Sequence, residues 1–269
     1  GENPLAFEPQ GSRVTTYLGP GEWSEPTPIF EKDFIPWRIK PRGQWLYMTG
    51  YTGGQSIYSQ DGEVIQVHWL RSQDGLSWEP AQPAQPIVLE GGVSETDLTW
   101  LEDGSLVAVS RNEAGDETGF GMKICRAKAS DLGIWTCVAD PKKYDSPLLF
   151  THENRVFLIG RKNITATGHY DVSDPGDSLQ DRYLDNQAAY WQSPKACALW
   201  EINAETLQVT HVLDLPSRGD TCFPELIRLD DHRYLGFNYT SPLDSDEPIS
   251  WLEGQMGPTH IVANVLSLP

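Results

Sequence analysis

Short apolar runs separated by polar turn residues repeat along this chain. In the segment from Glu95 to Glu113 (ETDLTWLEDGSLVAVSRNE), one apolar strand leads into Asp103-Gly104 and a second returns to Arg111. Asp-Gly between two such runs is the strongest short-range signal for a β-hairpin. Because a hairpin places the start of its first strand beside the end of its second, we expect Glu95 and Arg111 to be neighbours.

The same hairpin pattern recurs three more times. Each copy has a charged residue at the start of its first strand and a polar residue at the end of its second. The copies are WRIKPRGQWLYMTGY (Trp37 to Tyr51), DSPLLFTHENRVFLIGRKN (Asp145 to Asn163) and DTCFPELIRLDDHRYLGFNYT (Asp220 to Thr240). Their charged starting residues are 57, 50 and 75 residues apart, counted along Arg38, Glu95, Asp145 and Asp220. Repeats of this length, each a small antiparallel sheet, predict an all-β fold of the β-propeller type.

The number of blades follows from the start of the chain. Residues 1–34 are rich in Pro and Gly, and strands are expected near 12–18 and 23–29. The motif GEWSEP matches SWEP, which closes the next unit, so it resembles the outer edge of a blade whose inner half is not visible. We therefore predict a five-bladed propeller with a partial first blade, with a four-bladed propeller as the alternative. One domain is expected to span residues 1–269.

The motif SQDGLSW, from Ser72 to Trp78, fits the Asp-box pattern S-x-D-G-x-[ST]-W. In such a turn the side chain of Asp74 accepts hydrogen bonds from the backbone, and Trp78 packs beneath it. A weaker copy ends at Trp135. We expect this motif to be structural and to lie on the outside of the wheel.

One long polar and aromatic segment, 165–195, interrupts the third unit and has no clear period. Loops of this length are typically functional or disordered. Since the segment leaves from the strand end that carries Arg161, we expect a wall or lid over the centre.

Charge and cysteine usage narrow the possible partners. The chain has 20 basic and 38 acidic residues, a net charge of −18, which argues against a nucleic acid or an anionic membrane as partner. Neither a long apolar run nor a signal-peptide pattern is visible, so a soluble chain of unknown compartment is expected. The four cysteines lack C-x-x-C spacing, so neither a metal nor another cofactor is expected. A disulfide between Cys125 and Cys137 is one possibility, and free buried thiols are favoured.

Several of these segments together resemble a known family. WRIKP, SQDGLSW, ETDLTWLEDGSLVAVSRNE, SPLLF with GRKN, and RGDTCFPEL with FNYTS are similar to the sialidase-like, BNR-repeat propellers, especially a five-bladed bacterial type. The resemblance covers roughly residues 20–268. It implies a glycoside hydrolase-like protein that acts on or binds a terminal sugar at the central axis, so the expected partner is a carbohydrate. Sialidases hold a sugar acid with three arginines and use a tyrosine nucleophile that a glutamate activates.

The ends of the four hairpins supply the candidate site, because the innermost strands of a propeller line its axis. The catalytic candidates are Glu95, Asp220 and Tyr239. The candidates for substrate binding are Arg38, Tyr51, Asp97, Arg111, Asp145 and Arg161. Arginine suits bidentate capture of a carboxylate, which favours an acidic sugar. The alternative is that the arginines only neutralise the carboxylates of a buried axis.

Three functions stay open at this point. The first is hydrolysis of a terminal glycoside, and the second is a carbohydrate-binding or scaffold propeller without turnover. The third is a uronate-directed polysaccharide lyase in which Tyr239 removes a proton. Two carboxyl groups about 5 to 10 Å apart at the rim would favour hydrolysis.

Overall fold

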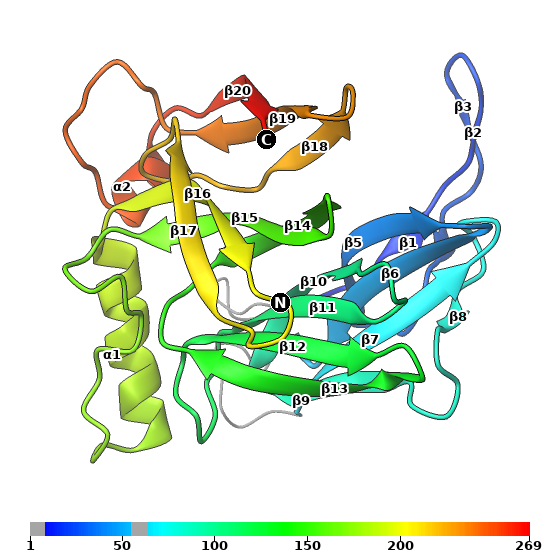
Figure 1. Cartoon of the computed structure of the whole chain (residues 1–269), viewed down its shortest axis with the longest axis horizontal. Coiled ribbons are helices and arrows are strands. Elements are labelled where there is room, and N and C mark those ends of the chain that lie inside the picture. Colours follow the sequence, from blue (N-terminus) through cyan, green and yellow to red (C-terminus); the bar gives the residue numbers. More distant parts are fainter. Residues whose placement is uncertain (1–8, 55–63) are drawn as a thin grey trace.

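A computed structural model of the chain describes residues 9–54 and 64–269. Within these residues, four antiparallel sheets follow one another around a common centre, and helices are few (Figure 1). The first strand of the second sheet contacts the first strands of the sheets on either side. The fold is therefore the predicted all-β propeller, with four blades in the part of the chain that the structure describes.

Each blade begins with one of the four hairpins that the sequence predicts. Blade 1 contains β5 (Ile35–Arg42), β6 (Trp45–Thr52), β7 (Ile65–Ser72), β8 (Glu79–Pro80) and β9 (Ile87–Gly91), the last two both pairing with β7. Blade 2 contains β10 (Val93–Trp100), β11 (Leu106–Asn112), β12 (Met122–Lys128) and β13 (Asp131–Asp140). Blade 3 contains β14 (Asp145–His152), β15 (Arg155–Asn163), β16 (Lys195–Ile202) and β17 (Val209–Leu215). Blade 4 contains β18 (Glu225–Arg228), β19 (Arg233–Thr240) and β20 (His260–Ser267).

The predicted fifth blade is not formed by residues 9–34. This region instead makes two short ladders, which pair β1 (Arg13–Val14) with β4 (Thr27–Pro28) and β2 (Tyr17–Gly19) with β3 (Glu22–Trp23). The β2–β3 hairpin stands away from the sheets at the upper right of Figure 1. Both of its aromatic side chains, Tyr17 and Trp23, are exposed.

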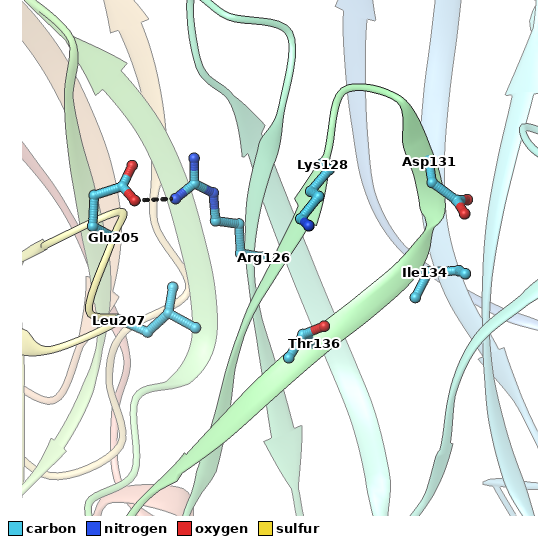
Figure 2. Close-up of a pocket in the computed structure, with 7 residues that line it drawn as sticks. All are labelled: Arg126, Lys128, Asp131, Ile134, Thr136, Glu205 and Leu207. Carbon is cyan, nitrogen blue, oxygen red and sulfur yellow. Dashed lines mark ion pairs between the residues drawn. The ribbon is translucent and has the colours of Figure 1, made fainter.

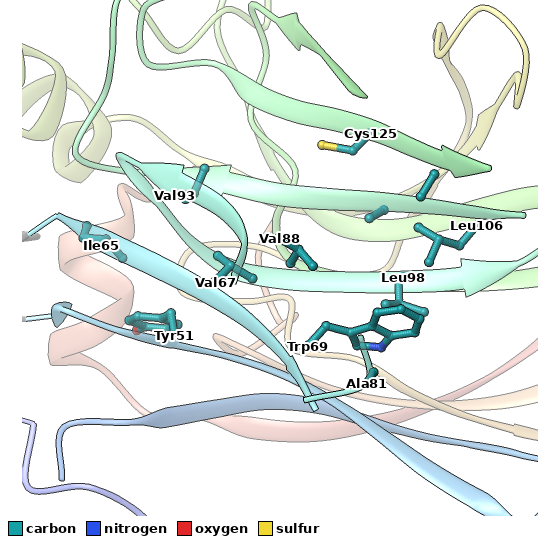
Figure 3. Packing of buried hydrophobic residues seen from close by; sticks show 12 residues of the cluster. Tyr51, Ile65, Val67, Trp69, Ala81, Val88, Val93, Leu98, Leu106 and Cys125 are labelled. Atoms are coloured by element: carbon teal, nitrogen blue, oxygen red, sulfur yellow. The ribbon is translucent and has the colours of Figure 1, made fainter. Parts of the chain in front are cut away.

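Apolar side chains on both faces of the inner strands hold neighbouring blades together. In β11, Leu106 and Ala108 pack towards blade 1, whereas Val107 and Val109 pack towards blade 3. Figure 3 shows the first of these interfaces, where Trp69 of β7 lies beside Leu98 of β10. A strand that is buried on both faces has a continuous run of apolar residues, which explains the sequence LVAV at the start of β11.

Blade 4 departs from this arrangement because only one of its faces is covered. Tyr234 and Leu266 are buried against blade 3. The opposite face carries Phe237, Ile261 and Val265, which are 41%, 74% and 60% exposed. Blade 4 is thus packed against the rest of the propeller on one side only.

Irregular backbone begins each of the first three inner strands. The pairing register shifts between Pro36 and Arg38 in β5, between Val93 and Thr96 in β10, and between Asp145 and Leu148 in β14. Such bulges bend a strand and change the direction of its side chains. In β14 the bulge includes Ser146, whose φ of 54° lies in the left-handed region. The bulges therefore lie at the starts of the strands that carry the candidate residues Arg38, Glu95 and Asp145.

The expectation of free thiols was wrong. Cys125 and Cys137 form a disulfide between β12 and β13, because the register of these strands places the two residues directly opposite each other. A second disulfide joins Cys197 of β16 to Cys222, which precedes β18. This second bond connects blade 3 to blade 4.

Two helices lie outside the blades, and the longer one falls in the segment 165–195, which was expected to have no clear period. The first is α1 (Leu179–Gln192), which begins at the N-cap residue Ser178, and the second is α2 (Trp251–Met256). The polar composition of α1 hides its period, but Ser178 and Asp181 have the spacing of a helix start, and the Ser178 side chain accepts from the Asp181 amide. Among the described residues, no helix has the length and apolar character needed to cross a membrane.

The turn that contains Asp74 joins the third and fourth strands of blade 1, away from the inner strands. An oxygen of Asp74 accepts hydrogen bonds from the backbone amides of Leu76 and Ser77, both at 2.8 Å, and from the hydroxyl of Ser72 at 2.9 Å. The Trp78 ring donates to the backbone oxygen of Gly75 at 3.1 Å. These amide contacts lower the pKa of Asp74 to about 2.

Replacement of Asp74 by Ala is expected to lower the melting temperature at pH 7. Because the folded state lowers the pKa of Asp74, its stabilising contribution is present above the ordinary carboxyl pKa and is lost as the pH falls towards 2. Thermal melts of both proteins should therefore differ at pH 7 and converge between about pH 4 and pH 2. The exposed Asp244→Ala serves as control and should melt like the wild type. A gap that persists unchanged at pH 2 would contradict this role.

Candidate functional site

Arg111 is the most heavily engaged cation at the rim where the inner strands begin. Its guanidinium pairs with Glu95 at 2.8 Å, with Glu113 at 2.9 Å and with Asp145 at 3.1 Å. The predicted contact between Glu95 and Arg111 is therefore present. Burial alone would raise the pKa of Asp145, but the neighbouring cations Arg111 and Lys143 outweigh it and lower that pKa. Asp145 is consequently held as a carboxylate.

Arg161 organises a second group of polar side chains. Its three nitrogens donate to the backbone oxygen of Thr221 at 2.6 Å, to the hydroxyl of Tyr190 at 2.9 Å and to the hydroxyl of Tyr239 at 2.9 Å. The hydroxyl of Tyr239 in turn donates to Asp220 at 2.8 Å. Burial raises the pKa of Tyr239 to about 12, so its phenol is protonated at neutral pH. Arg161, Tyr239 and Asp220 thus form one hydrogen-bonded chain.

Arg38 lies on the other side of β14. It donates to the backbone oxygens of Pro147 at 3.2 Å and Ser146 at 3.5 Å. Its guanidinium also lies 4.7 Å from the centre of the Phe223 ring. Its carboxylate partner is Glu225 at 3.2 Å, whose side chain is 67% exposed.

The start of β14 connects these groups. The backbone amide of Ser146 donates to Glu95 at 2.9 Å, while its backbone oxygen accepts from Arg38. Asp145, the preceding residue, pairs with Arg111. The left-handed backbone of Ser146 therefore lies between Arg38 and the Glu95–Arg111 pair, and the three predicted arginines meet around one strand end.

Helix α1 packs against this rim through Tyr190. The ring of Tyr190 lies 5.9 Å from the guanidinium carbon of Arg111, and its hydroxyl accepts from Arg161. A neighbouring ring, Tyr170, lies 5.5 Å from Tyr190 and 3.6 Å from the amine of Lys143. The segment expected to form a wall or lid thus contacts two of the three arginines.

Four participants were missed by the sequence reasoning: Glu113, Lys143, Tyr190 and Lys195. Burial lowers the pKa of Lys143 to about 8 and that of Lys195 to about 7. Two of them had a signal in the sequence. Glu113 follows Arg111 by two residues and Lys143 precedes Asp145 by two, and residues two apart on a strand face the same side.

The group contains equal numbers of basic and acidic side chains. Its cations are Arg111, Lys143, Arg161 and Lys195, and its carboxylates are Glu95, Glu113, Asp145 and Asp220. Buried charges require partners, and Arg111 and Arg161 find carboxylate partners within the protein. This arrangement is the one expected if the arginines neutralise the axis.

Two predicted site residues lie elsewhere. Tyr51 is 5% exposed and packs in the apolar cluster between blades 1 and 2 (Figure 3). Asp97 is buried and accepts from the amine of Lys40 at 2.7 Å and from the backbone amide of Leu149 at 2.6 Å. Asp97 therefore links the inner strands of blades 1, 2 and 3.

A cavity of about 860 Å³ lies away from this rim, between outer strands of blades 2 and 3 (Figure 2). Its lining residues are Arg126, Lys128, Asp131, Ile134, Thr136, Glu205 and Leu207. Arg126 and Glu205 pair with each other at 2.7 Å. The rim holds a tyrosine, carboxylates and cations in mutual contact, which makes it the stronger candidate for chemistry.

No protein-family model matches the sequence, and no curated protein matches it. Among solved structures, the chain is similar to a protein of unknown function from Dyadobacter fermentans, with 17% identity and a TM-score of 0.57 over 97% of this chain and 65% of that one. It is also similar to Trypanosoma rangeli sialidase in complex with 2,3-difluorosialic acid, with 12% identity and a TM-score of 0.49 over 87% and 36% of the two chains. An exo-1,5-alpha-L-arabinanase from a bovine ruminal metagenomic library gives 8% identity and a TM-score of 0.47 over 92% and 83%.

The chain spans less than two thirds of the length of the first two of these structures. At 17% identity the first likeness concerns the fold alone. The other two, with TM-scores below 0.5, carry no argument about the activity of this chain.

Replacement of Arg111 by Lys is expected to lower the free energy of unfolding by about 3 kcal/mol, because one amine cannot satisfy three buried carboxylates. Chemical denaturation of both proteins measures the difference. The control is Arg71→Lys, since Arg71 pairs with the largely exposed Glu79 and the change should cost less than about 1 kcal/mol. Equal losses for the two variants would show that the axial pairs are no stronger than surface pairs.

Proposed function

We propose that the chain is a carbohydrate-active propeller, similar to glycoside hydrolases, which binds a terminal sugar at the rim and cleaves its glycosidic bond with Tyr239 and Asp220. The observation that carries this proposal is the hydrogen-bonded chain from Arg161 to Tyr239 to Asp220. A nucleophile in contact with a base, beside a third group that orients it, is the general signature of covalent catalysis.

Arg161, Tyr239 and Asp220 each have a defined role in the proposed reaction. The phenol oxygen of Tyr239 attacks the anomeric carbon while its proton passes to Asp220, and the bond to the leaving oxygen breaks. The pKa of about 12 means that Tyr239 needs this base at neutral pH. Arg161 stabilises the negative charge that develops on the phenol oxygen.

Proton transfers complete the cycle. The leaving oxygen takes a proton from water, which leaves a hydroxide ion. A second water then displaces Tyr239 from the sugar and gives its extra proton to that hydroxide, while the phenolate recovers its proton from Asp220. Glu95 accepts from both Arg111 and the backbone amide of Ser146. We therefore assign Glu95 to the positioning of Arg111, in place of the catalytic role for which the sequence made it a candidate.

An acidic sugar is the finer part of the proposal, and Arg38 is the residue that we assign to its carboxylate. Arg111 already meets three carboxylates, whereas the carboxylate partner of Arg38 is the exposed Glu225. Exposed ion pairs contribute little, so a sugar carboxylate can take the place of Glu225 at small loss. Arg38 is also fixed by two backbone oxygens, which orients its guanidinium for a planar anion.

A second candidate is sugar binding without turnover. It is favoured by helix α1, because the buried Tyr190 occupies one nitrogen of Arg161 and covers this side of the group. In that case Tyr239 and Asp220 serve as hydrogen-bonding groups for the ligand.

The Tyr239→Phe variant is expected to lower kcat by about a thousandfold on the best substrate from a panel of neutral and acidic aryl glycosides and uronate oligosaccharides. The control is Tyr234→Phe, which lies on the same strand but on the face that packs against blade 3. Hydrolysis that survives in Tyr239→Phe would refute the nucleophile. Sugar binding by a wild type that turns over no substrate would support the second candidate, and an unsaturated product would indicate elimination.

Replacement of Arg38 by Gln should weaken the binding of an acidic sugar by about tenfold or more and leave a neutral sugar of the same ring size unaffected. Calorimetric titration of both proteins with both sugars measures this difference. Glu225→Gln is the matched variant, and it should bind the acidic sugar at least as tightly as the wild type. Equal losses for neutral and acidic sugars in Arg38→Gln would contradict a carboxylate contact.

A further inference from the structure

One aromatic ring at the rim has no part in the proposed reaction. Phe223 precedes β18, and 43% of this residue is exposed. The ring of Trp37 is perpendicular to it with ring centres 5.0 Å apart, and the guanidinium carbon of Arg38 lies 4.7 Å from its centre. A partly exposed aromatic ring therefore lies directly beside the arginine that we assign to the sugar carboxylate.

The backbone around Phe223 is held in place on both sides. Cys222, the preceding residue, has a left-handed φ of 78° and forms the disulfide with Cys197. The backbone amide of Phe223 donates to the side-chain oxygen of the buried Asn238 at 3.0 Å. The next residue is Pro224, whose ring fixes its own φ. A side chain on a backbone that is ordered in advance loses less conformational entropy when a ligand binds.

Residues 220–223 join the two halves of the proposed sugar site. Asp220 is the proposed base, the backbone oxygen of Thr221 accepts from Arg161 at 2.6 Å, and Phe223 lies against Arg38. Three residues of extended chain span at most about 11 Å, so the Cα atoms of Asp220 and Phe223 are no further apart than this. A sugar whose carboxylate is bound by Arg38 and whose glycosidic bond is near Asp220 therefore lies alongside Phe223.

We propose that Phe223 contacts the apolar C–H side of the sugar and so determines which ring shape the site accepts. This inference rests on the proposed function. Small-molecule sites characteristically combine apolar and aromatic surface with a few polar groups that fix the orientation of the ligand. Arg38 and Asp220 supply the polar groups, and Phe223 supplies the aromatic surface.

The contact favours one class of acidic sugar. In a six-membered sugar whose hydroxyls are mostly equatorial, the axial C–H groups form an uninterrupted apolar patch on a face of the ring. These weakly positive C–H groups suit the negative face of an aromatic ring. The substrate class that follows is a pyranose acid of the uronic type, in which the carboxylate extends from the edge of the ring and leaves that patch free.

The test is calorimetric titration with methyl glycosides of glucuronic acid and glucose, and of galacturonic acid and galactose. Each pair shares its ring and hydroxyls and differs in the carboxylate. Phe223→Ala should weaken the binding of both members of a pair by about tenfold, and Phe223→Leu, which keeps apolar bulk against Trp37, should also weaken both. Arg38→Gln should affect the acidic member alone. The control is Trp23→Ala, which removes an exposed aromatic ring from the β2–β3 hairpin and should bind like the wild type.

Three results would overturn the contact while the proposed function stands. These are a loss limited to the acidic members, which would mean that Phe223 only orients Arg38, unchanged affinities in both Phe223 variants, or a wild type that binds the acidic members but neither neutral one. A wild type that binds none of the four sugars would overturn the proposed function, and this inference with it. Failure of the contact and failure of the proposed function are therefore distinguishable.

Discussion

The neutralisation of Arg111 is the interaction on which the centre of this propeller depends. Its guanidinium is enclosed by Glu95 from β10, Glu113 just after β11 and Asp145 from β14. A buried charge that loses one partner is strongly destabilising, so the relative positions of blades 2 and 3 are fixed by electrostatics as well as by apolar packing. The same requirement limits how many additional anions the rim can accept.

Irregular backbone is what makes this arrangement possible. A regular strand would point alternate side chains into the two blade interfaces, which are apolar. The bulge at the start of β14 allows Asp145 to reach Arg111 while Ser146 presents its amide to Glu95 and its oxygen to Arg38. The left-handed conformation of Ser146 costs on the order of 1 kcal/mol, and the three contacts offset it. The positions of the polar groups at the rim therefore depend on both a strained backbone residue and the contacts between charged side chains.

The sequence allowed the blades to be predicted because their determinants are local. The turn at Asp103-Gly104 and the apolar runs on either side fix the β10–β11 hairpin, and with it the contact between Glu95 and Arg111. The same rule failed for Tyr51, because a residue at a strand end can face either the axis or the blade interface. One-residue differences in bulge position decide between the two, and no sequence pattern reports them.

Contacts between segments that are distant in the sequence could not be predicted from local patterns. Tyr190 reaches Arg161 from a helix whose polar sequence conceals its period, and Cys197 meets Cys222 across two blades. The disulfide between Cys125 and Cys137 was one of the possibilities that the sequence left open, and the register of β12 and β13 decides it. The predicted fifth blade shows the opposite error. The match between the motifs GEWSEP and SWEP predicted part of a blade that residues 9–34 do not form.

The bare face of blade 4 has a consequence for cooperativity. A unit that is packed on one side has fewer contacts to lose, so its local opening free energy lies below that of the other blades. Tyr239 and Asp220 belong to this unit, whereas Arg161 belongs to blade 3. Opening of blade 4 would therefore separate Tyr239 and Asp220 from Arg161 and break the hydrogen-bonded group at the rim. Amide hydrogen exchange in β19 would report on the fraction of molecules in which blade 4 is closed.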